Sequence, residues 1–388
     1  MKVFLVAGEP SGDRLGAALM RGLTELVPGV TFLGVGGPEM AAQGLSSLFP
    51  MDELSVMGLA EVLPRYPQLK RRMHQTAQAV LDTGPDVLVT IDSPDFCLRV
   101  AKEVRKVRHV HTVHYVAPSV WAWRPGRATK MARHVDQVLA LLPFEPPYLE
   151  AAGLRCDFVG HPVVAEPVVP ERDARRFREE FGIGSAPLLL ALPGSRRSEV
   201  QRLAPVFGQA LGPLRDRHPD LRVVVPAAAA VAEQVADAIA SWPGRAILLD
   251  PRDDPASAAV NKARAFAAAD AALAASGTVS LELAAAGTPM VIAYDMNRLT
   301  WAIMRRMVRI DTVTLVNLVT DSRVVPEFLG PACQPEPIAE ALGDLLRAPD
   351  LQTPALSRTM QALGRGGEAP GLRAARAILD GLTAGRGI

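Results

Sequence analysis

Residues 2–13 read KVFLVAGEPSGD, and this stretch decides the fold class. Its unbroken apolar run, residues 3–7, is typical of a strand buried on both faces, as in a parallel sheet covered by helices. The glycine, proline and serine that follow indicate a tight turn into a helix. The run is too short for a secretory signal, so it is interpreted as the first strand of an α/β domain.

The same alternation of short apolar runs and longer amphipathic stretches continues along the chain. Strands are predicted at residues 2–7, 30–35, 86–91, 109–116, 136–141 and 155–159, and again at 187–192, 221–225, 246–249, 270–274 and 289–294. This pattern predicts two doubly wound, Rossmann-like domains. The proline-rich segment 161–170 indicates the boundary, giving domains at 1–165 and 166–345 and a helical tail at 346–388. The apolar stripe at 369–382 could pack back on the first domain.

Composition excludes several classes of protein. The 388 residues are 49% apolar with a net charge of +1, so neither a disordered chain nor strong global attraction to nucleic acid is expected. Cys97, Cys156 and Cys333 are scattered and lack metal-site spacing, as in a reduced cytosolic protein. The most apolar stretch, 271–293, contains Glu282 and Pro289 and is a poor membrane span.

Three loops in the first half could bind a substrate. The first, after residue 7, offers Glu9 and Ser11 to an anion or a sugar hydroxyl; alternatively it is a plain turn with Ser11 or Asp13 as the helix N-cap. The second loop places Asp92 after a buried strand, where a carboxylate could act as a general base. Asp95, which follows a proline, is better explained as an N-cap.

The third loop, residues 114–124, combines aromatic and polar side chains. Trp121 and Trp123 alternate with Ser119 and Arg124. Such a mixture suits a sugar or a lipid-linked substrate, which needs apolar faces and a few polar contacts. A tryptophan-rich core is the structural alternative.

Two loops in the second half are candidates for binding a diphosphate. Residues 192–200 place Gly194, Ser195 and Arg196 at a helix N-terminus, although Glu199 could form a purely structural ion pair with an arginine there. Residues 275–289 supply Ser276, Gly277 and Thr278 as donors, and Glu282 one helical turn later as an acceptor for ribose hydroxyls.

These motifs resemble the lipid-A-disaccharide synthases, glycosyltransferases of Gram-negative bacteria. The resemblance rests on the segments VAGE (6–9) with SGD (11–13), VMG (56–58), ID (91–92) with PDF (94–96), HYV (114–116), PSVWAWR (118–124), LPFE (142–145), GH (160–161), LPGSR (192–196) and ASGT (275–278), with Asn317 and CQP (333–335) nearer the tail. Pro10 and Val316 depart from the family pattern. Neither change removes a polar group assigned to the site.

The resemblance implies a GT-B fold, with two Rossmann-like domains facing across a cleft, and an inverting transfer that needs no metal and no cofactor. UDP-2,3-diacylglucosamine and 2,3-diacylglucosamine 1-phosphate (lipid X) would give a β(1→6) disaccharide phosphate and UDP. Implied catalytic residues are Asp92, Arg196 and Glu9. Implied donor contacts are Gly194, Ser195, Arg196, Ser276, Gly277, Thr278, Glu282 and Asn317, and implied acceptor contacts are Ser11, Asp95, Ser119, Trp121, Trp123 and Arg124.

Other functions remain open at this point. The same architecture serves UDP-N-acetylglucosamine epimerases and peptidoglycan glycosyltransferases, and a non-catalytic nucleotide-binding protein would keep the fold without the base. A nicotinamide oxidoreductase is disfavoured because no strand is followed by a G-x-G-x-x-G turn. The sequence leaves open whether the chain forms a homodimer.

Acylated substrates predict a protein on the cytoplasmic face of the inner membrane, peripheral to an anionic surface and without a nucleic-acid partner. Two segments, 63–73 and 298–309, mix apolar residues with arginine or lysine and could dock there. Burial of the same apolar residues in the core is the alternative for each.

Overall fold

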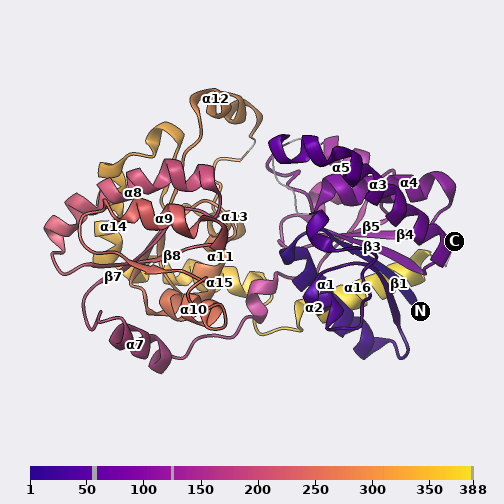
Figure 1. The fold of residues 1–388 in the computed structure, drawn as a ribbon, viewed down its shortest axis with the longest axis horizontal. Helices are drawn as coiled ribbons and strands as arrows, with labels where there is room; N and C mark the ends of the chain where they lie inside the picture. Colours follow the sequence, from indigo (N-terminus) through magenta and orange to yellow (C-terminus); the bar gives the residue numbers. More distant parts are fainter. Residues whose placement is uncertain (55–58, 124–125, 309, 386–388) are drawn as a thin grey trace. The chain divides into compact units, whose positions relative to one another are not determined.

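A computed structural model of the chain describes residues 1–54, 59–123, 126–308 and 310–385 (Figure 1). It consists of two compact units. Unit 1 comprises Met1–Ala165 and Leu363–Ile388, and unit 2 comprises Glu166–Ala362. In the described part of the chain, no helix is both long and apolar enough to cross a membrane.

Unit 1 is built on a six-stranded parallel sheet with the order β2-β1-β3-β4-β5-β6. The chain places β2 on one side of β1 and β3 on the other, so the strand order reverses between β1 and β3. In such sheets, ligands bind beyond the carboxyl ends of the strands at this switch point. The strands are β1 (Lys2–Ala7), β2 (Thr31–Val35), β3 (Val87–Ile91), β4 (His111–Tyr115), β5 (Gln137–Ala140) and β6 (Arg155–Phe158).

Unit 2 has a second parallel sheet of six strands, in the order β12-β11-β10-β7-β8-β9. Its switch point lies between β7 and β10, which pair side by side. The strands are β7 (Leu188–Leu192), β8 (Arg222–Pro226), β9 (Ile247–Leu249), β10 (Ala271–Ala275), β11 (Met290–Tyr294) and β12 (Glu327–Leu329). The eleven strands predicted from the sequence are all present. The three-residue edge strand β12 was not predicted.

Helices flank each sheet. Those of unit 1 are α1 (Pro10–Leu26), α2 (Pro38–Ala41), α3 (Leu59–Thr83), α4 (Pro94–Val107), α5 (Gly126–Met131), α6 (Pro146–Glu150) and α16 (Pro370–Gly385). Those of unit 2 are α7 (Glu171–Glu180), α8 (Arg197–Arg217), α9 (Ala232–Ile239), α10 (Ala258–Ala268), α11 (Val279–Ala286), α12 (Arg298–Met307), α13 (Leu315–Thr320), α14 (Pro335–Arg347) and α15 (Thr353–Ala362).

The first strand shows why its apolar run is continuous. Successive side chains of a strand point to opposite faces of the sheet. Val3 and Leu5 enter the core shared with α1 and α16, whereas Phe4 and Val6 enter the core shared with α3 and α4. Both faces of β1 are therefore buried, as the sequence predicted.

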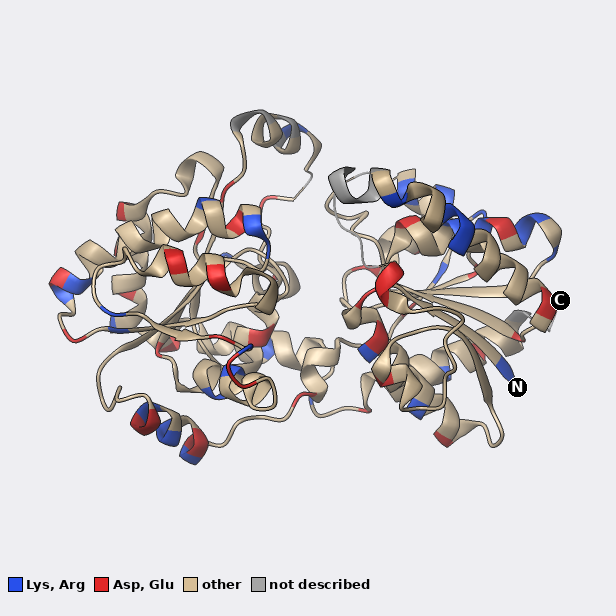
Figure 2. Cartoon of the chain, in the orientation of Figure 1, with Lys and Arg blue, Asp and Glu red and all other residues tan. Residues whose placement is uncertain are grey.

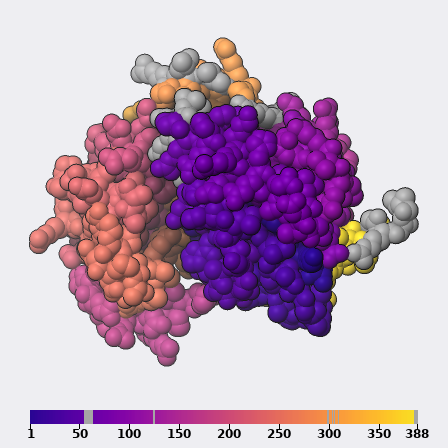
Figure 3. Space-filling model, turned by 45° about the vertical axis from the view of Figure 1, so that its right-hand side comes forward, coloured from indigo at the N-terminus to yellow at the C-terminus, as the bar shows by residue number. Residues whose placement is uncertain are grey.

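The C-terminal helix α16 belongs to unit 1, where it packs along α1 (Figure 1). In the space-filling view, the yellow C-terminal part of the chain emerges at the edge of the indigo and purple atoms of unit 1 (Figure 3). The two helices approach closely at glycines, since a Cβ on Gly22 would lie 2.7 Å from the carbonyl oxygen of Gly371. The sequence predicted a separate helical tail at residues 346–388. The structure instead places residues 346–362 in unit 2, and only the residues that follow belong to unit 1. Gln352 fixes residues 346–362 in unit 2: its buried amide exchanges two 2.8 Å hydrogen bonds with the backbone of Met290.

Candidate active site

Three loops leave the sheet of unit 1 at the same level. Ala7 at the end of β1 pairs with Ile91 at the end of β3, and Ile91 pairs with Tyr115 at the end of β4. The residues that follow, Gly8, Asp92 and Val116, therefore begin adjacent loops at the switch point. Glu9, Asp92 and the tryptophan-containing loop are brought to one edge, where doubly wound sheets bind ligands.

The backbone is strained at this edge. Asp92, Ser93 and Val116 have positive φ angles of 51°, 41° and 83°, although none is glycine. Such conformations cost about 1–3 kcal/mol each and persist only where the surrounding structure holds them, commonly at functional sites. Here the amide of Asp92 donates a 2.9 Å hydrogen bond to the carbonyl oxygen of Tyr115, which ties the β3 and β4 loops together.

The loops after β1 and β3 are also in close contact. A Cβ on Gly8 would lie 2.7 Å from Oγ of Ser93, so a larger residue would force that hydroxyl to move. Burial raises the pKa of the Cys97 thiol, and the charges of both Asp92 and Glu9 raise it further. Two carboxylates thus act on one buried thiol beneath this edge.

The expected N-caps are not found. Helix α1 has Glu9 at its N-cap position and Pro10 in its first turn, so neither Ser11 nor Asp13 caps it. Asp13 is buried, and its carboxylate instead accepts hydrogen bonds of 2.8, 2.9 and 3.1 Å from the amides of Gly37, Glu39 and Met40 at the start of α2. The acidic residue that resembled an N-cap of α1 therefore connects α1 to α2 instead.

Asp95 was also misassigned as an N-cap. Ser93 takes that position in α4, and its side chain forms no capping hydrogen bond. The Asp95 side chain is 93% exposed and lies 3.5 Å from the guanidinium of Arg127. It stands at the start of α4, open to solvent, while Ser11 is likewise exposed at the start of α1.

The loop after β4 is supported by Glu145, which belongs to one of the matching segments but was assigned no role from the sequence. Trp121 is half-buried; its indole N–H donates to Glu145 at 3.2 Å, and its ring packs edge-on against Phe144. Glu145 also accepts hydrogen bonds from the amides of Leu141 and Leu142. Burial raises the pKa of Glu145 to about 7, although the three hydrogen-bond donors each lower it.

The other residues of this loop differ in exposure. Ser119 is exposed and Trp123 half-buried, whereas Arg124 lies outside the described residues, as does the segment 56–58. His114 is buried on β4, where its Nδ1 lies 2.8 Å from Oγ1 of Thr90. Burial and then the charge of Arg127 lower the pKa of His114 to about 4, so this imidazole is neutral at pH 7.

In unit 2, the loop after β7 has a carboxylate where a phosphate was expected. Glu199 accepts hydrogen bonds from the amides of Ser195 and Arg196, at 3.1 and 3.2 Å, and pairs with the Arg196 guanidinium at 3.0 Å. The structural ion pair considered from the sequence is therefore present. Gly194, with a φ of 112°, is required because a Cβ there would lie 2.6 Å from Glu199.

Arg196 can still reach a ligand, because its side chain is 61% exposed. Glu199 is only 12% exposed, but it would keep the hydrogen bonds from the amides of Ser195 and Arg196 if the guanidinium moved away. A diphosphate could offer the guanidinium of Arg196 a bidentate contact in exchange.

The loop after β10 lies beside the loop after β7, since Ala274 pairs with Leu192. Gly277 and Thr278 are exposed at the N-terminus of α11, and Ser276 is half-buried. Glu282, expected to accept ribose hydroxyls, forms an ion pair with Lys262 of α10. This lysine was not predicted.

A cavity of about 470 Å³ opens at the carboxyl ends of β8 and β9. Its walls include Ala227, Leu249, Asp250 and Phe181, and it reaches Lys262 beside Glu282. Unit 2 thus offers an exposed arginine, a small-residue turn with free space around Gly277, and a pocket of ligand size.

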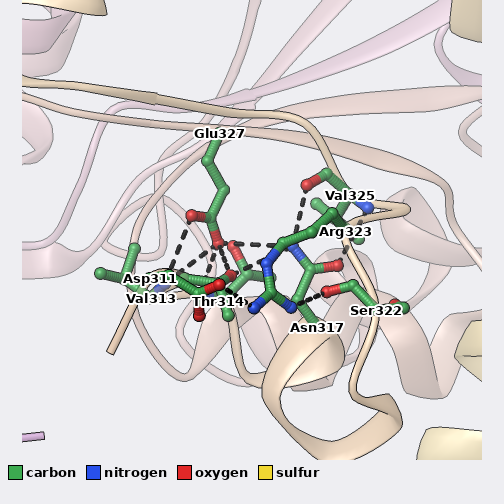
Figure 4. Close-up of polar contacts among 9 residues, drawn as sticks. Asp311, Val313, Thr314, Asn317, Ser322, Arg323, Val325 and Glu327 are labelled. Atoms are coloured by element: carbon green, nitrogen blue, oxygen red, sulfur yellow. Dashed lines mark hydrogen bonds and ion pairs between the residues drawn. The ribbon is translucent and has the colours of Figure 1, made fainter. Parts of the chain in front are cut away.

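Asn317 holds the fold of unit 2 together rather than facing a ligand. Its amide is fully buried. It exchanges hydrogen bonds with the backbone of Val325 and donates to Thr312 (Figure 4). Glu327 joins the same network by accepting from the backbone of Val313 and Thr314. We therefore remove Asn317 from the direct donor contacts.

Two parallel doubly wound sheets, each with polar loops at its switch point, define a protein of the GT-B class. UDP-N-acetylglucosamine 2-epimerase from Neisseria meningitidis, solved with UDP-GlcNAc, has this fold, with a TM-score of 0.64 and coverage of 99% of this chain and 100% of that chain. At 13% identity the likeness concerns the fold alone.

The family follows from the sequence comparisons. A family model described as lipid-A-disaccharide synthetase matches residues 3–363. The lipid-A-disaccharide synthase of Ruegeria pomeroyi is 66% identical over 98% of this chain and 96% of that protein, and the one of Rhodospirillum centenum is 52% identical over 98% and 94%. The chain belongs to the lipid-A-disaccharide synthase family, whose members are glycosyltransferases. The UDP-N-acetylglucosamine epimerases, considered as an alternative function, are similar to this chain in fold only.

Proposed function

We propose that unit 1 binds the acceptor, 2,3-diacylglucosamine 1-phosphate, and that unit 2 binds the donor, UDP-2,3-diacylglucosamine. The supporting observation is the common level of the β1, β3 and β4 ends, which gathers two carboxylates and an aromatic loop at the switch point of unit 1. The products are a β(1→6) disaccharide phosphate and UDP.

The reaction needs one base and one stabiliser of negative charge. Asp92 accepts the proton of the acceptor hydroxyl as its oxygen attacks the anomeric carbon from the face opposite UDP, which inverts that centre. Glu9 lies at the same edge and supports the negative potential that favours proton transfer. The bond from the anomeric carbon to the phosphate oxygen breaks, and its electron pair leaves with UDP.

Unit 2 meets the charge that develops on the leaving group. Arg196 turns from Glu199 to the diphosphate, and the exposed turn at Ser276, Gly277 and Thr278 supplies backbone and hydroxyl donors. The cavity beside Lys262 receives the nucleoside, with Glu282 accepting its ribose hydroxyls. Gly194 and Ser195 shape the turn that carries Arg196.

Product analysis tests this function directly. The purified chain is incubated with UDP-2,3-diacylglucosamine and lipid X, and the disaccharide phosphate is identified by mass spectrometry. Simple UDP-N-acetylglucosamine serves as the competing substrate. Turnover of UDP-N-acetylglucosamine alone, without disaccharide from the acylated pair, would overturn the proposal in favour of an epimerase or peptidoglycan enzyme.

The enzyme reaches its acylated substrates from an anionic membrane surface on the cytoplasmic side of the inner membrane. Of the first docking segment, Arg65, Tyr66, Lys70 and Arg71 are exposed on α3, where basic residues of unit 1 gather (Figure 2). Leu69 and Met73 instead pack against the core. Arg72 is held by Glu53 at 2.6 Å, so it is not counted with the docking residues.

The second segment contributes less. Trp301 is half-buried and packs against Gly330, whose added Cβ would lie 2.6 Å from the indole ring. The side chains of Leu63, Arg298, Leu299, Ile303, Arg305 and Arg309 lie outside the described residues.

Vesicle binding tests this docking surface. Each basic residue near an anionic surface is worth about 1 kcal/mol, so Lys70→Glu/Arg71→Glu should release the protein from anionic liposomes. Arg172→Glu/Arg175→Glu, on exposed α7, is the charge-matched control. Retained binding of the α3 variant, or wild-type binding that does not fall with salt, contradicts the assignment.

A further inference from the structure

A basic pocket in unit 1 lies between α4 and α5 and belongs to none of the contacts assigned so far except Asp95. It has a volume of about 370 Å³. Leu98 and Met131 line it together with positively charged side chains from both helices and the turn that follows α5: Arg99, Lys102, Arg127, Lys130 and Arg133. Five cations thus surround the pocket with one carboxylate.

The pairing of the cations on α4 distinguishes this pocket from an ordinary charged surface. Arg105 and Lys106, which do not line it, have ion-pair partners in Asp136 and Glu103. Arg99 and Lys102, which do line it, have no ion pair among the residues that the structure describes. Like charges left together without partners repel one another, and an anion would relieve that repulsion.

The pocket also adjoins the catalytic edge. It begins at Pro94 and Asp95, directly after Asp92 and Ser93, and it extends along one face of α4 through residues 98, 99 and 102. With a rise of about 1.5 Å per residue, positions 95 to 102 cover roughly 10 Å. The pocket therefore begins at Pro94, two residues after Asp92, and extends about 10 Å along the helix from that end.

We propose that this pocket binds the phosphate monoester of the acceptor, with Arg99 and Lys102 as its main ligands and Lys130 as the opposing cation. This inference rests on the proposed function for the identity of the acceptor. Leu98 and Met131 give the pocket an apolar lining, which suits an acylated sugar phosphate better than a free phosphate ion.

The test compares two acceptors that differ only in the phosphate. Binding of short-chain 2,3-diacylglucosamine 1-phosphate, and of the same sugar without phosphate, is measured by calorimetry in the absence of donor. The variant Arg99→Ala/Lys102→Ala should lower the preference for the phosphorylated acceptor by about 100-fold, roughly tenfold for each of the two charge-assisted bonds lost. Lys106→Ala, on the same helix but outside the pocket, is the matched control and should keep that preference.

Each other outcome contradicts the proposal. An equal loss for both acceptors means that the cations support the fold, and an unchanged preference means that the phosphate binds elsewhere. A variant that loses only its binding to phosphatidate vesicles assigns the pocket to a lipid headgroup. Because the donor is absent, the measurement also separates this inference from the proposed function: an enzyme that binds the phosphate yet forms no disaccharide fails only the latter.

Discussion

Replacement of Asp92 by asparagine tests its proposed role as the base. The residue has a φ of 51°, in the left-handed region. Asparagine and aspartate both tolerate this conformation, so Asp92→Asn removes the proton acceptor without adding backbone strain. Alanine at this position would combine both effects and could not separate them.

The expected effect falls on the chemical step. Loss of a general base typically lowers the rate by about 10²–10⁴, which corresponds to roughly 2.7–5.5 kcal/mol of activation free energy. The affinity for UDP should stay at the wild-type value, because the proposed UDP contacts all lie in unit 2. The assay is the initial rate of disaccharide formation at saturating substrates, alongside calorimetric titration of UDP.

Two neighbouring carboxylates provide matched controls. Asp95 is 93% exposed and pairs only weakly with Arg127 at 3.5 Å, so Asp95→Asn should cost less than about tenfold in rate. Glu9→Gln tests whether the second carboxylate at this edge shares the proton. A rate for Asp92→Asn within a few-fold of wild type refutes the assignment, and inactivity of Asp95→Asn alone moves the base to that residue.

Three further predictions concern binding and stability. Arg196→Ala should weaken UDP binding by about 1.5–3 kcal/mol in calorimetry and Arg197→Ala by less; the reverse order would show that Arg197 is the UDP ligand. Asp13→Ala should lower the free energy of unfolding in urea by about 3 kcal/mol, because three amides lose a charged acceptor, and a loss below about 1 kcal/mol would contradict that role. The folded pKa of Glu145, about 7, exceeds the unfolded value of 4.5, so its contribution is fully present below pH 4.5 and about 3 kcal/mol is lost as pH rises through 7. The unfolding free energy of Glu145→Gln, compared with wild type across this range, should lack that decline; parallel pH curves would refute it.

The elements that the sequence predicted well are those whose signal is local. Each buried strand is a short apolar run bounded by turn residues, so β1 is predicted at its observed limits. The edge strand β12 was missed because it is three residues long and begins with the charged Glu327. The equally short β9 was predicted because its residues Ile247–Leu249 form an unbroken apolar run. Loops directly after strands were also placed correctly, because parallel strands end at one edge of the sheet.

The errors come from side chains whose partners are distant in sequence. Asp13 looked like a cap for its own helix, but its amide partners are 24 to 27 residues away. The partner of Glu282 was missed because Lys262 lies on another helix, 20 residues earlier. Asn317 resembled a binding residue because its motif matched, whereas its amide is consumed by Val325 and Thr312 inside the fold.

For an acceptor bound to unit 1 as proposed, the arrangement of charge favours one orientation. The carboxylates of Glu9 and Asp92 lie at the strand ends, whereas the unpaired cations Arg99 and Lys102 lie farther along α4. A sugar phosphate bound in reverse would place its phosphate against two carboxylates and leave the cations without an anion. Both effects raise the free energy of the reversed complex. Only the orientation with a hydroxyl toward Asp92 satisfies both ends. Residues that bind the phosphate would therefore also decide which hydroxyl reacts, and the base need not distinguish among the hydroxyls itself.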